Sequence, residues 1–134
     1  MATTYSRDLE RLTQSGLQPA DPERDVRDRE VTDRLGEHIG TVVDVLIDPA
    51  ERRIRMLEVL DGHGLLGIGR KHHLVPVEAI VGGDPRTVAV NCDRDALLSA
   101  ETYRQAEGDE EEAQYRAAYA AFGITPYWEV ETPA

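Results

Sequence analysis

The sequence predicts a mainly β protein, a small antiparallel barrel with short helical appendages at its N-terminal and C-terminal ends. Two apolar runs bracket an Asp-Pro turn between positions 38 and 60, further turn signals recur from position 33 to position 85, and no long helical pattern interrupts this region. Short strands joined at regular spacing by turns are typical of a small barrel, whereas sheets with crossover helices alternate strands with long helical patterns.

The clearest element is a hairpin of residues 38–47 and 53–60 around the turn Asp48-Pro49-Ala50-Glu51. Strand alternation predicts that one face of the first strand carries Ile39, Thr41, Val43, Val45 and Ile47, and that the other carries Val42, Asp44 and Leu46. The second strand is predicted to point Ile54, Met56 and Leu60 to one side, and Arg53 and Arg55 to solvent. Since the first strand is apolar on both faces, we expect it to bend between layers or to lie under a covering segment.

Shorter elements complete the predicted barrel. Val31-Thr32 and a turn at residues 33–36 precede the hairpin. Residues 74–80 resume an extended pattern, in which Pro76 predicts an edge or a bulge because proline has no N–H to donate to a neighbouring strand. The last strand is predicted from Thr87 to Asn91, with Val88, Val90 and Cys92 facing inward, and a turn of helix follows at residues 93–98.

The chain therefore divides into three segments. Residues 1–28 are predicted to form a short helix, capped by Ser6, ended by Gly16 and carrying Leu9 and Leu12 on one face, and then a charged linker. Residues 29–98 form the barrel domain. Residues 99–134 form an acidic helix and tail. Asp109 and Glu112 have the spacing of a capping box, one face carries Tyr115, Ala118, Tyr119 and Phe122, and Gly123 and Pro126 end the helix.

The charge balance bears on partners. The chain holds 26 acidic and 15 basic residues, a net charge of −11, with eight acidic and two basic residues after position 98. Nucleic-acid binding draws on lysine and arginine to neutralise phosphates, so we expect no nucleic-acid partner, and a basic protein surface is the better candidate. A single cysteine and the lack of a signal peptide or membrane-length apolar run predict a soluble, cytoplasmic protein without direct membrane insertion.

Three motifs could each be interpreted either as a functional site or as an ordinary structural feature. The G-x-G-x-x-G pattern at residues 62–67 is interpreted as a flexible hairpin loop, because dinucleotide binding needs a following helix and here Arg70-Lys71 and another strand follow. Adjacent strand residues point to opposite faces, so we interpret His38, His63, His72 and His73 as solvated loop histidines and not as metal ligands. Cys92 continues a buried face and is interpreted as a core residue. No catalytic residue, cofactor or metal ligand is predicted.

Two further groups of residues, one basic and one aromatic, could lie on the surface. Five basic residues, Arg52, Arg53, Arg55, Arg70 and Lys71, are interpreted as ordinary surface balanced by Glu51, Glu58 and Asp61. Five of the seven aromatic residues cluster within the last 20 positions of the acidic tail, namely Tyr115, Tyr119, Phe122, Tyr127 and Trp128. We predict that this tail folds back over the outer side of the barrel or exchanges within a homodimer; the alternative is an element that docks on a partner.

Several runs resemble the PRC-barrel family: Val31-Thr-Asp-Arg-Leu-Gly-Glu-His-Ile-Gly-Thr-Val42, Leu46-Ile-Asp-Pro49 and Leu66-Gly-Ile-Gly-Arg-Lys-His-His-Leu-Val-Pro-Val-Glu-Ala-Ile80. The match covers roughly residues 28–98, and the endings Phe122-Gly123 and Pro126-Tyr127-Trp128 are similar to those of small stand-alone bacterial members. The family includes the cytoplasmic domain of the H subunit of photosynthetic reaction centres and the C-terminal domain of a ribosome-maturation factor. This chain lacks the membrane helix of the first and the additional N-terminal domain of the second, so it resembles a stand-alone member.

The resemblance implies a barrel without enzymatic activity that acts through protein contacts. The first hypothesis is a cytoplasmic PRC-barrel adaptor that binds a protein partner through the barrel surface around the glycine loop and the aromatic tail. Its predicted partner-contact residues are Leu65, Leu66, Ile68, Arg70, Lys71, Tyr127 and Trp128. One alternative is a reaction-centre H-subunit-like protein that modulates electron or proton transfer in photosynthetic light reactions. Another is a small-ligand-binding barrel, although so few strands normally enclose only their own side chains.

Overall fold

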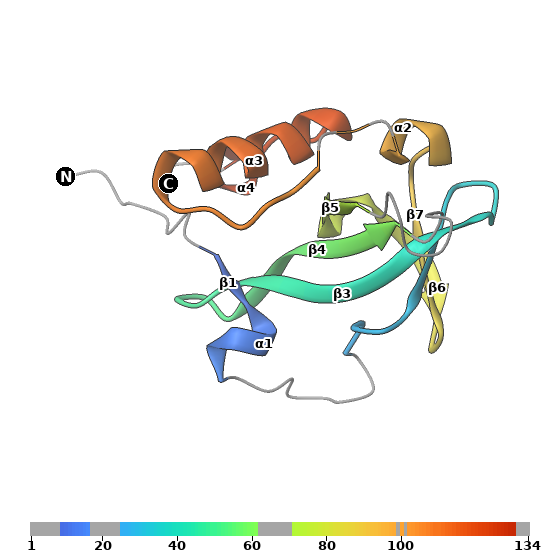
Figure 1. The fold of residues 1–134 in the computed structure, drawn as a ribbon, viewed down its shortest axis with the longest axis horizontal. Coiled ribbons are helices and arrows are strands. Elements are labelled where there is room, and N and C mark those ends of the chain that lie inside the picture. The colour runs from blue at the N-terminus through green and yellow to red at the C-terminus, as the bar shows by residue number, and fades with distance from the viewer. Residues whose placement is uncertain (1–8, 17–24, 62–70, 99, 101, 131–134) are drawn as a thin grey trace.

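The computed structural model describes residues 9–16, 25–61, 71–98, 100 and 102–130, and its centre is a curled sheet with the C-terminal helices on one side and the short N-terminal helix on the other (Figure 1). The strands are β1 (Glu10–Arg11), β2 (Glu30–Thr32), β3 (His38–Asp48), β4 (Arg53–Asp61), β5 (His72–Pro76), β6 (Ile80–Asp84) and β7 (Thr87–Val90). The helices are α1 (Leu12–Ser15), the 3₁₀ turn η2 (Val77–Ala79), α2 (Arg94–Leu98), α3 (Gly108–Ala121) and α4 (Tyr127–Val130). The predicted mainly β, barrel-like fold with helical appendages is confirmed.

The strands follow the order β5-β4-β3-β2-β7-β6, and β1 also pairs with β3. The predicted antiparallel arrangement holds for every ladder except that between β2 and β7, which run parallel. These two strands are far apart in the sequence, so no tight turn forces them to be antiparallel. β5 lies at one end of the order, so Pro76 occupies an edge strand, as predicted.

The hairpin forms where the sequence predicts it, and Asp48 shapes its turn. The backbone N–H groups of Ala50 and Glu51 donate to the Asp48 carboxylate at 2.9 and 3.2 Å. The Arg52 N–H donates to the Asp48 carbonyl at 2.7 Å, with Arg52 at a φ of 54°. An aspartate that binds the backbone two and three residues later stabilises such a turn locally.

β-bulges correct the predicted faces of β3. The pairing with β4 shifts between Val42 and Asp44, so Val43 is an extra residue, and the pairing with β2 skips Ile39. Each extra residue reverses the alternation of side chains. Val42 was predicted opposite Ile39, but both side chains are fully buried in the same cluster.

A similar irregularity corrects β4. Its register shifts where Leu46 pairs with Met56 and Ile47 pairs with Ile54, so Arg55 is the extra residue. Ile54 was predicted to face inward with Met56, but it is 38% exposed. Arg55 was predicted to face solvent with Arg53, but it is buried.

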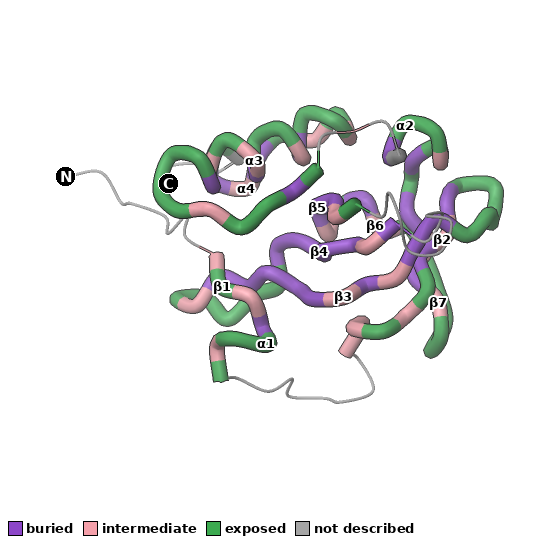
Figure 2. Tube along the Cα trace, in the orientation of Figure 1, coloured by how far each residue is buried: buried purple, intermediate pink, exposed green. Residues whose placement is uncertain are grey.

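Two hydrophobic clusters lie on opposite sides of the sheet, and the buried part of the chain follows β3, β4 and β5 (Figure 2). The inner cluster fills the curl of the sheet with residues such as Ile39, Val42, Val45, Val88, Val90 and Cys92. The outer cluster joins Leu46, Met56 and Leu74 of the sheet to Tyr103, Tyr115, Tyr119 and Trp128 of the C-terminal segment. The C-terminal segment therefore covers the second apolar face of β3, which is why that strand is apolar on both sides.

The N-terminal segment differs from its prediction. Ser6 lies outside the described residues, and the helical part is only Leu12–Ser15, which ends at Gly16 with a φ of 77°, as predicted. Glu10 and Arg11 instead pair with Ile47 and Leu46 as a strand. Leu9 consequently packs against the outer cluster and Leu12 lies in the inner one, so they do not share a helix face.

Helix α3 begins at Gly108 and carries Tyr115, Ala118 and Tyr119 of the predicted apolar face against the outer cluster, whereas Phe122 follows the helix and packs against the inner cluster. The predicted capping box is absent. Its N-cap, Glu107, makes no side-chain cap hydrogen bond. The glutamate that bonds to the backbone before the helix is Glu111 and not Glu112. The Glu111 carboxylate accepts the Ala106 N–H at 2.9 Å. Gly108, at a φ of 60°, follows the N-cap Glu107, so the helix begins two residues earlier than it would with a cap at Asp109.

Candidate functional site

The predicted partner-contact residues fall in three places. Leu65, Leu66, Ile68 and Arg70, together with the G-x-G-x-x-G loop, lie outside the described residues. Lys71 is exposed just before β5. Tyr127 is half-buried and Trp128 is buried, and both lie against the chain's own barrel.

The aromatic tail folds back, held by arginine–aromatic and edge-on ring contacts. The Arg55 guanidinium lies 4.0 Å from the centre of the Tyr127 ring, and that of Arg116 lies 5.5 Å from the Trp128 ring. The Trp128 ring meets the Tyr119 ring edge-on at 5.8 Å between centroids. Such contacts add to the burial of the rings. The burial of Arg55 is thus explained by α4, which covers it.

The histidines behave differently from one another. His72 and His73 point to opposite faces of β5, as predicted: His72 Nδ1 lies 2.6 Å from the Glu58 carboxylate, and His73 is 1% exposed. The prediction of solvated loop histidines is therefore wrong for both residues, because β5 begins at His72, whose ring contacts the buried Glu58, and directs the His73 side chain into the protein. His38 is exposed at the start of β3, and His63 lies outside the described residues. Within the described ranges, no group of three or more histidine, cysteine or acidic residues is placed to hold a metal ion.

Cys92 lies in the inner cluster, as expected of a core residue. Burial, together with the negative charge of Asp33, raises its pKa to about 11. A thiol with such a raised pKa is rarely ionised near neutral pH, and only the thiolate is a good nucleophile.

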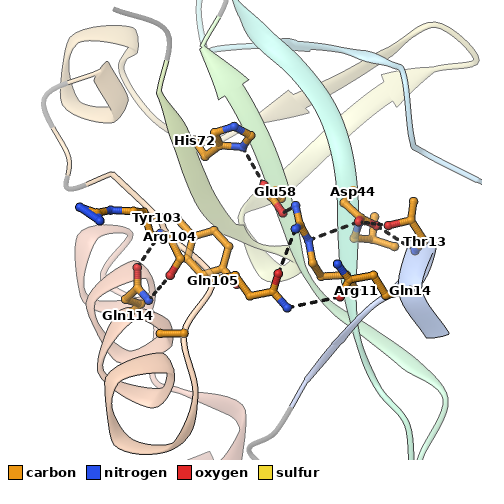
Figure 3. Close-up of polar contacts among 12 residues, drawn as sticks. Arg11, Thr13, Gln14, Asp44, Glu58, His72, Tyr103, Arg104, Gln105 and Gln114 are labelled. Atoms are coloured by element: carbon orange, nitrogen blue, oxygen red, sulfur yellow. Dashed lines mark hydrogen bonds and ion pairs between the residues drawn. The ribbon is translucent and has the colours of Figure 1, made fainter.

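A buried polar cluster ties the N-terminal segment to the sheet (Figure 3). The Arg11 guanidinium lies between two carboxylates, 2.5 Å from Glu58 and 3.4 Å from Asp44, and it also donates to Gln105 at 3.2 Å. Asp44 and Glu58 are each 2% exposed. Asp44 further accepts hydrogen bonds from the Thr13 hydroxyl and from the Val45 N–H, the latter at 2.8 Å. These contacts hold β1 and α1 on β3 and β4.

The cluster continues into the C-terminal segment through Tyr103 and Glu111. The Tyr103 hydroxyl donates to Glu111 at 2.7 Å, and its backbone N–H donates to the His72 carbonyl at 2.7 Å. Burial raises the pKa of Tyr103, and the negative charges of Glu111 and Glu58 raise it further. The tyrosine is therefore a neutral hydrogen-bond donor to Glu111.

A cavity of about 400 Å³ opens beside this cluster, between β1 and the chain around residues 103–108. Its lining includes the apolar residues Leu9 and Leu46 and the polar residues Arg11, Tyr103, Gln105, Glu111 and Tyr115. Such a volume is in the range of small-ligand and side-chain pockets. The site unites three parts of the chain that are distant in sequence.

The sequence analysis did not single out Arg11, Asp44, Glu58 or Glu111 as a site. One signal could have found two of them, since Asp44 and Glu58 each interrupt an apolar strand run, and a charge there requires a buried partner. Arg11 and Glu111 carry no comparable signal, because the neighbouring sequence of each is ordinary for an exposed helix.

None of the described helices has the length and apolar character needed to cross a bilayer. No curated protein matches the chain. The curled sheet and the helical arm folded over its outer face define a small, barrel-like β protein. Residues 23–97, more than half of the chain, match the PRC-barrel domain, and the protein belongs to the PRC-barrel family.

Proposed function

We propose that this protein is a non-enzymatic PRC-barrel adaptor that binds another protein. One observation carries the proposal: the buried polar side chains are used to fasten segments together. Arg11, Asp44 and Glu58 join β1 to the sheet, and Glu111 joins the 103–106 segment to α3. The PRC-barrel family is not a known enzyme family, which agrees with this use.

The negative net charge of the chain supports a partner with a basic surface. The net charge is −11, and the first turn of α3 adds Asp109, Glu110 and Glu111 to the side of the molecule that holds the cavity. Asp109 and Glu110 are exposed. A surface of one sign attracts a partner of the opposite sign and speeds its association at low ionic strength. We extend the proposed contact to the segment before β5, where Lys71 is exposed.

A site-specific photo-crosslinker in the full-length chain tests this proposal. One variant carries the crosslinker at Glu110 and the other at Arg53, which is also exposed but lies at the β3–β4 turn. In cells of the native host, we expect the Glu110 variant to capture one protein with a basic surface, and the Arg53 variant to capture none. Capture of no protein from position 110, or of the same proteins from both positions, counts against the adaptor function.

The reaction-centre role and the small-ligand role stay predictions. The described inner face of the sheet is packed with its own apolar side chains, such as Ile39, Val45 and Val90, as small barrels normally are.

A further inference from the structure

We infer that the C-terminal segment, residues 102–130, is a displaceable cover that opens as a unit while the sheet stays folded. Opening uncovers the apolar outer face of the sheet, which is formed by Leu46, Met56 and Leu74. The inference goes beyond the proposed adaptor function and does not depend on it. It draws on the attachment of the segment, on the cavities beside it and on one buried hydroxyl group.

Backbone hydrogen bonds between described residues attach the segment to the sheet at one place. The Tyr103 N–H donates to the His72 carbonyl at 2.7 Å, and the other backbone bonds of the segment join its own residues. By comparison, β3 pairs with β4 from Gly40 to Asp48. A unit with few bonds to the rest of a protein can open without global unfolding. The C-terminal segment is such a unit.

The packing of the segment on the sheet is interrupted by two cavities. One of about 390 Å³ lies between β5 and α3, with Leu74, Ala117 and Ala118 in its lining. The other is the cavity of about 400 Å³ beside β1, which Tyr115 lines. A side chain that lines a cavity lacks dispersion contacts on that side. The segment is therefore held less strongly than a fully packed interface would hold it.

The hydroxyl of Tyr119 disfavours the closed form. Tyr119 is 0% exposed, yet its hydroxyl has no hydrogen-bond partner among the described residues. Tyr115, four residues earlier on the same helix, is also buried, but its hydroxyl bonds to the Glu111 side chain and to the Leu9 backbone. Burial of a hydroxyl without a partner costs free energy, because its bonds to water are lost. Opening returns the Tyr119 hydroxyl to water and recovers this cost.

Opening changes which surface the molecule presents. Helices α3 and α4 lie over the outer side of the sheet (Figure 1). Beneath them, Leu46, Met56 and Leu74 are only 1%, 0% and 6% exposed. Any contact with this apolar face therefore requires the open form, and such a contact would shift the population toward it. The segment is in this sense an autoinhibitory cover.

Native-state hydrogen exchange of the full-length protein, followed by NMR at low urea concentrations, tests the opening. We expect the amides of residues 112–121 in α3 to share one protection factor, at least about tenfold below that of the amides in β3 and β4. This protection should also fall less steeply with urea, because opening exposes less surface than global unfolding does. Equal protection of α3 and the sheet overturns the inference. Protection that falls residue by residue toward the helix ends is fraying, and it also overturns the inference.

Met56 and Leu57 test whether opening uncovers the outer face. They are neighbours on β4 and both are 0% exposed, but Met56 lies in the outer cluster and Leu57 in the inner one. In a Cys92→Ala background, Met56→Cys and Leu57→Cys each carry a single thiol, and its rate of reaction with an aromatic disulfide reagent is measured without denaturant. We expect Met56→Cys to react at least about tenfold faster, because only global unfolding exposes the inner cluster. Equal rates contradict the inference.

Matched tyrosine variants test the contribution of the hydroxyl. Tyr119→Phe removes a hydroxyl that bonds to no described residue, and we expect it to raise the protection of the α3 amides about fivefold or more. Tyr115→Phe removes a bonded hydroxyl from the same helix, and we expect it to lower this protection about threefold or more. Hydrogen exchange of the two full-length variants gives the comparison. Unchanged or lowered protection in Tyr119→Phe overturns the inference.

Discussion

The guanidinium of Arg11 lies 2.5 Å from the carboxylate of Glu58, a buried residue that comes 47 positions later in the chain. This contact crosses from the N-terminal segment to β4 and adds to the backbone pairing of β1 with β3. Its consequence is that the stability of the barrel depends on a residue outside the 23–97 domain match.

Arg11→Ala is therefore expected to destabilise the whole protein. It leaves Asp44 and Glu58 buried without their shared cation, and removal of one partner from a buried ion pair typically costs about 3 kcal/mol or more. Urea unfolding measures the loss. The control is Arg104→Ala, at an exposed arginine, which should change the free energy of unfolding by less than about 0.5 kcal/mol. Equal losses in the two variants would show that the buried contact contributes nothing specific.

Asp33 makes stability depend on pH in the acid range. Its carboxylate accepts the N–H groups of Leu35 and Glu37 at 2.9 Å each. Burial opposes the charged form, but these backbone donors outweigh it, so the pKa of Asp33 lies below its usual range. A carboxyl group with a depressed folded-state pKa adds stability above its unfolded pKa, and this contribution is lost as the pH falls through the folded value.

Asp33→Asn is thus expected to lower the thermal midpoint at pH 7. The difference from the wild type should shrink as the pH falls below about 4, where the aspartate of the unfolded chain becomes protonated. Thermal melts between pH 3 and pH 7 measure this difference. A gap that stays constant over that range would mean that the charge of Asp33 plays no part.

Trp128 tests whether the tail is part of the core. The ring is buried against Tyr119 and the outer cluster, so Trp128→Ala should cost about 3 kcal/mol of unfolding free energy. Leu35→Ala removes an apolar side chain that is 77% exposed, and it should cost less than about 0.5 kcal/mol. Chemical denaturation compares them. A Trp128→Ala protein as stable as Leu35→Ala would show that the tail does not pack on its own barrel.

Gly40 and Gly82 both lie in strands, but only Gly40 is closely packed against a neighbouring strand. A Cβ at Gly40 would lie 2.2 Å from the Leu60 carbonyl oxygen, whereas a Cβ at Gly82 would meet nothing within 4 Å. We expect Gly40→Ala to cost about 2 kcal/mol, because the backbone of β4 must shift. Gly82→Ala should stay within about 0.5 kcal/mol of the wild type. Thermal and urea unfolding of the two variants give the comparison, and equal stability would contradict the close approach of β3 and β4 at this point.

The pattern of the sequence was enough to predict the hairpin, its aspartate-proline turn, the edge position of Pro76 and the apolar face of α3. Each depends on neighbours in the chain, through turn chemistry, proline geometry or helical spacing, and local rules describe such features well. The same rules failed at Val42 and Arg55, because an extra residue in a strand reverses the alternation of side chains up to the next irregularity and leaves little trace in the sequence.

The candidate site also has one part that the sequence predicts and one part that depends on the tertiary structure. The sequence by itself determined that Asp44 and Glu58 are charges within apolar strands, and so that each needs a partner. Only the tertiary structure decided that Arg11 is that partner and that the Tyr103 hydroxyl and the Ala106 N–H donate to Glu111. The reason is that these groups come from segments far apart in the chain, and their meeting depends on how β1 and α3 pack against the sheet.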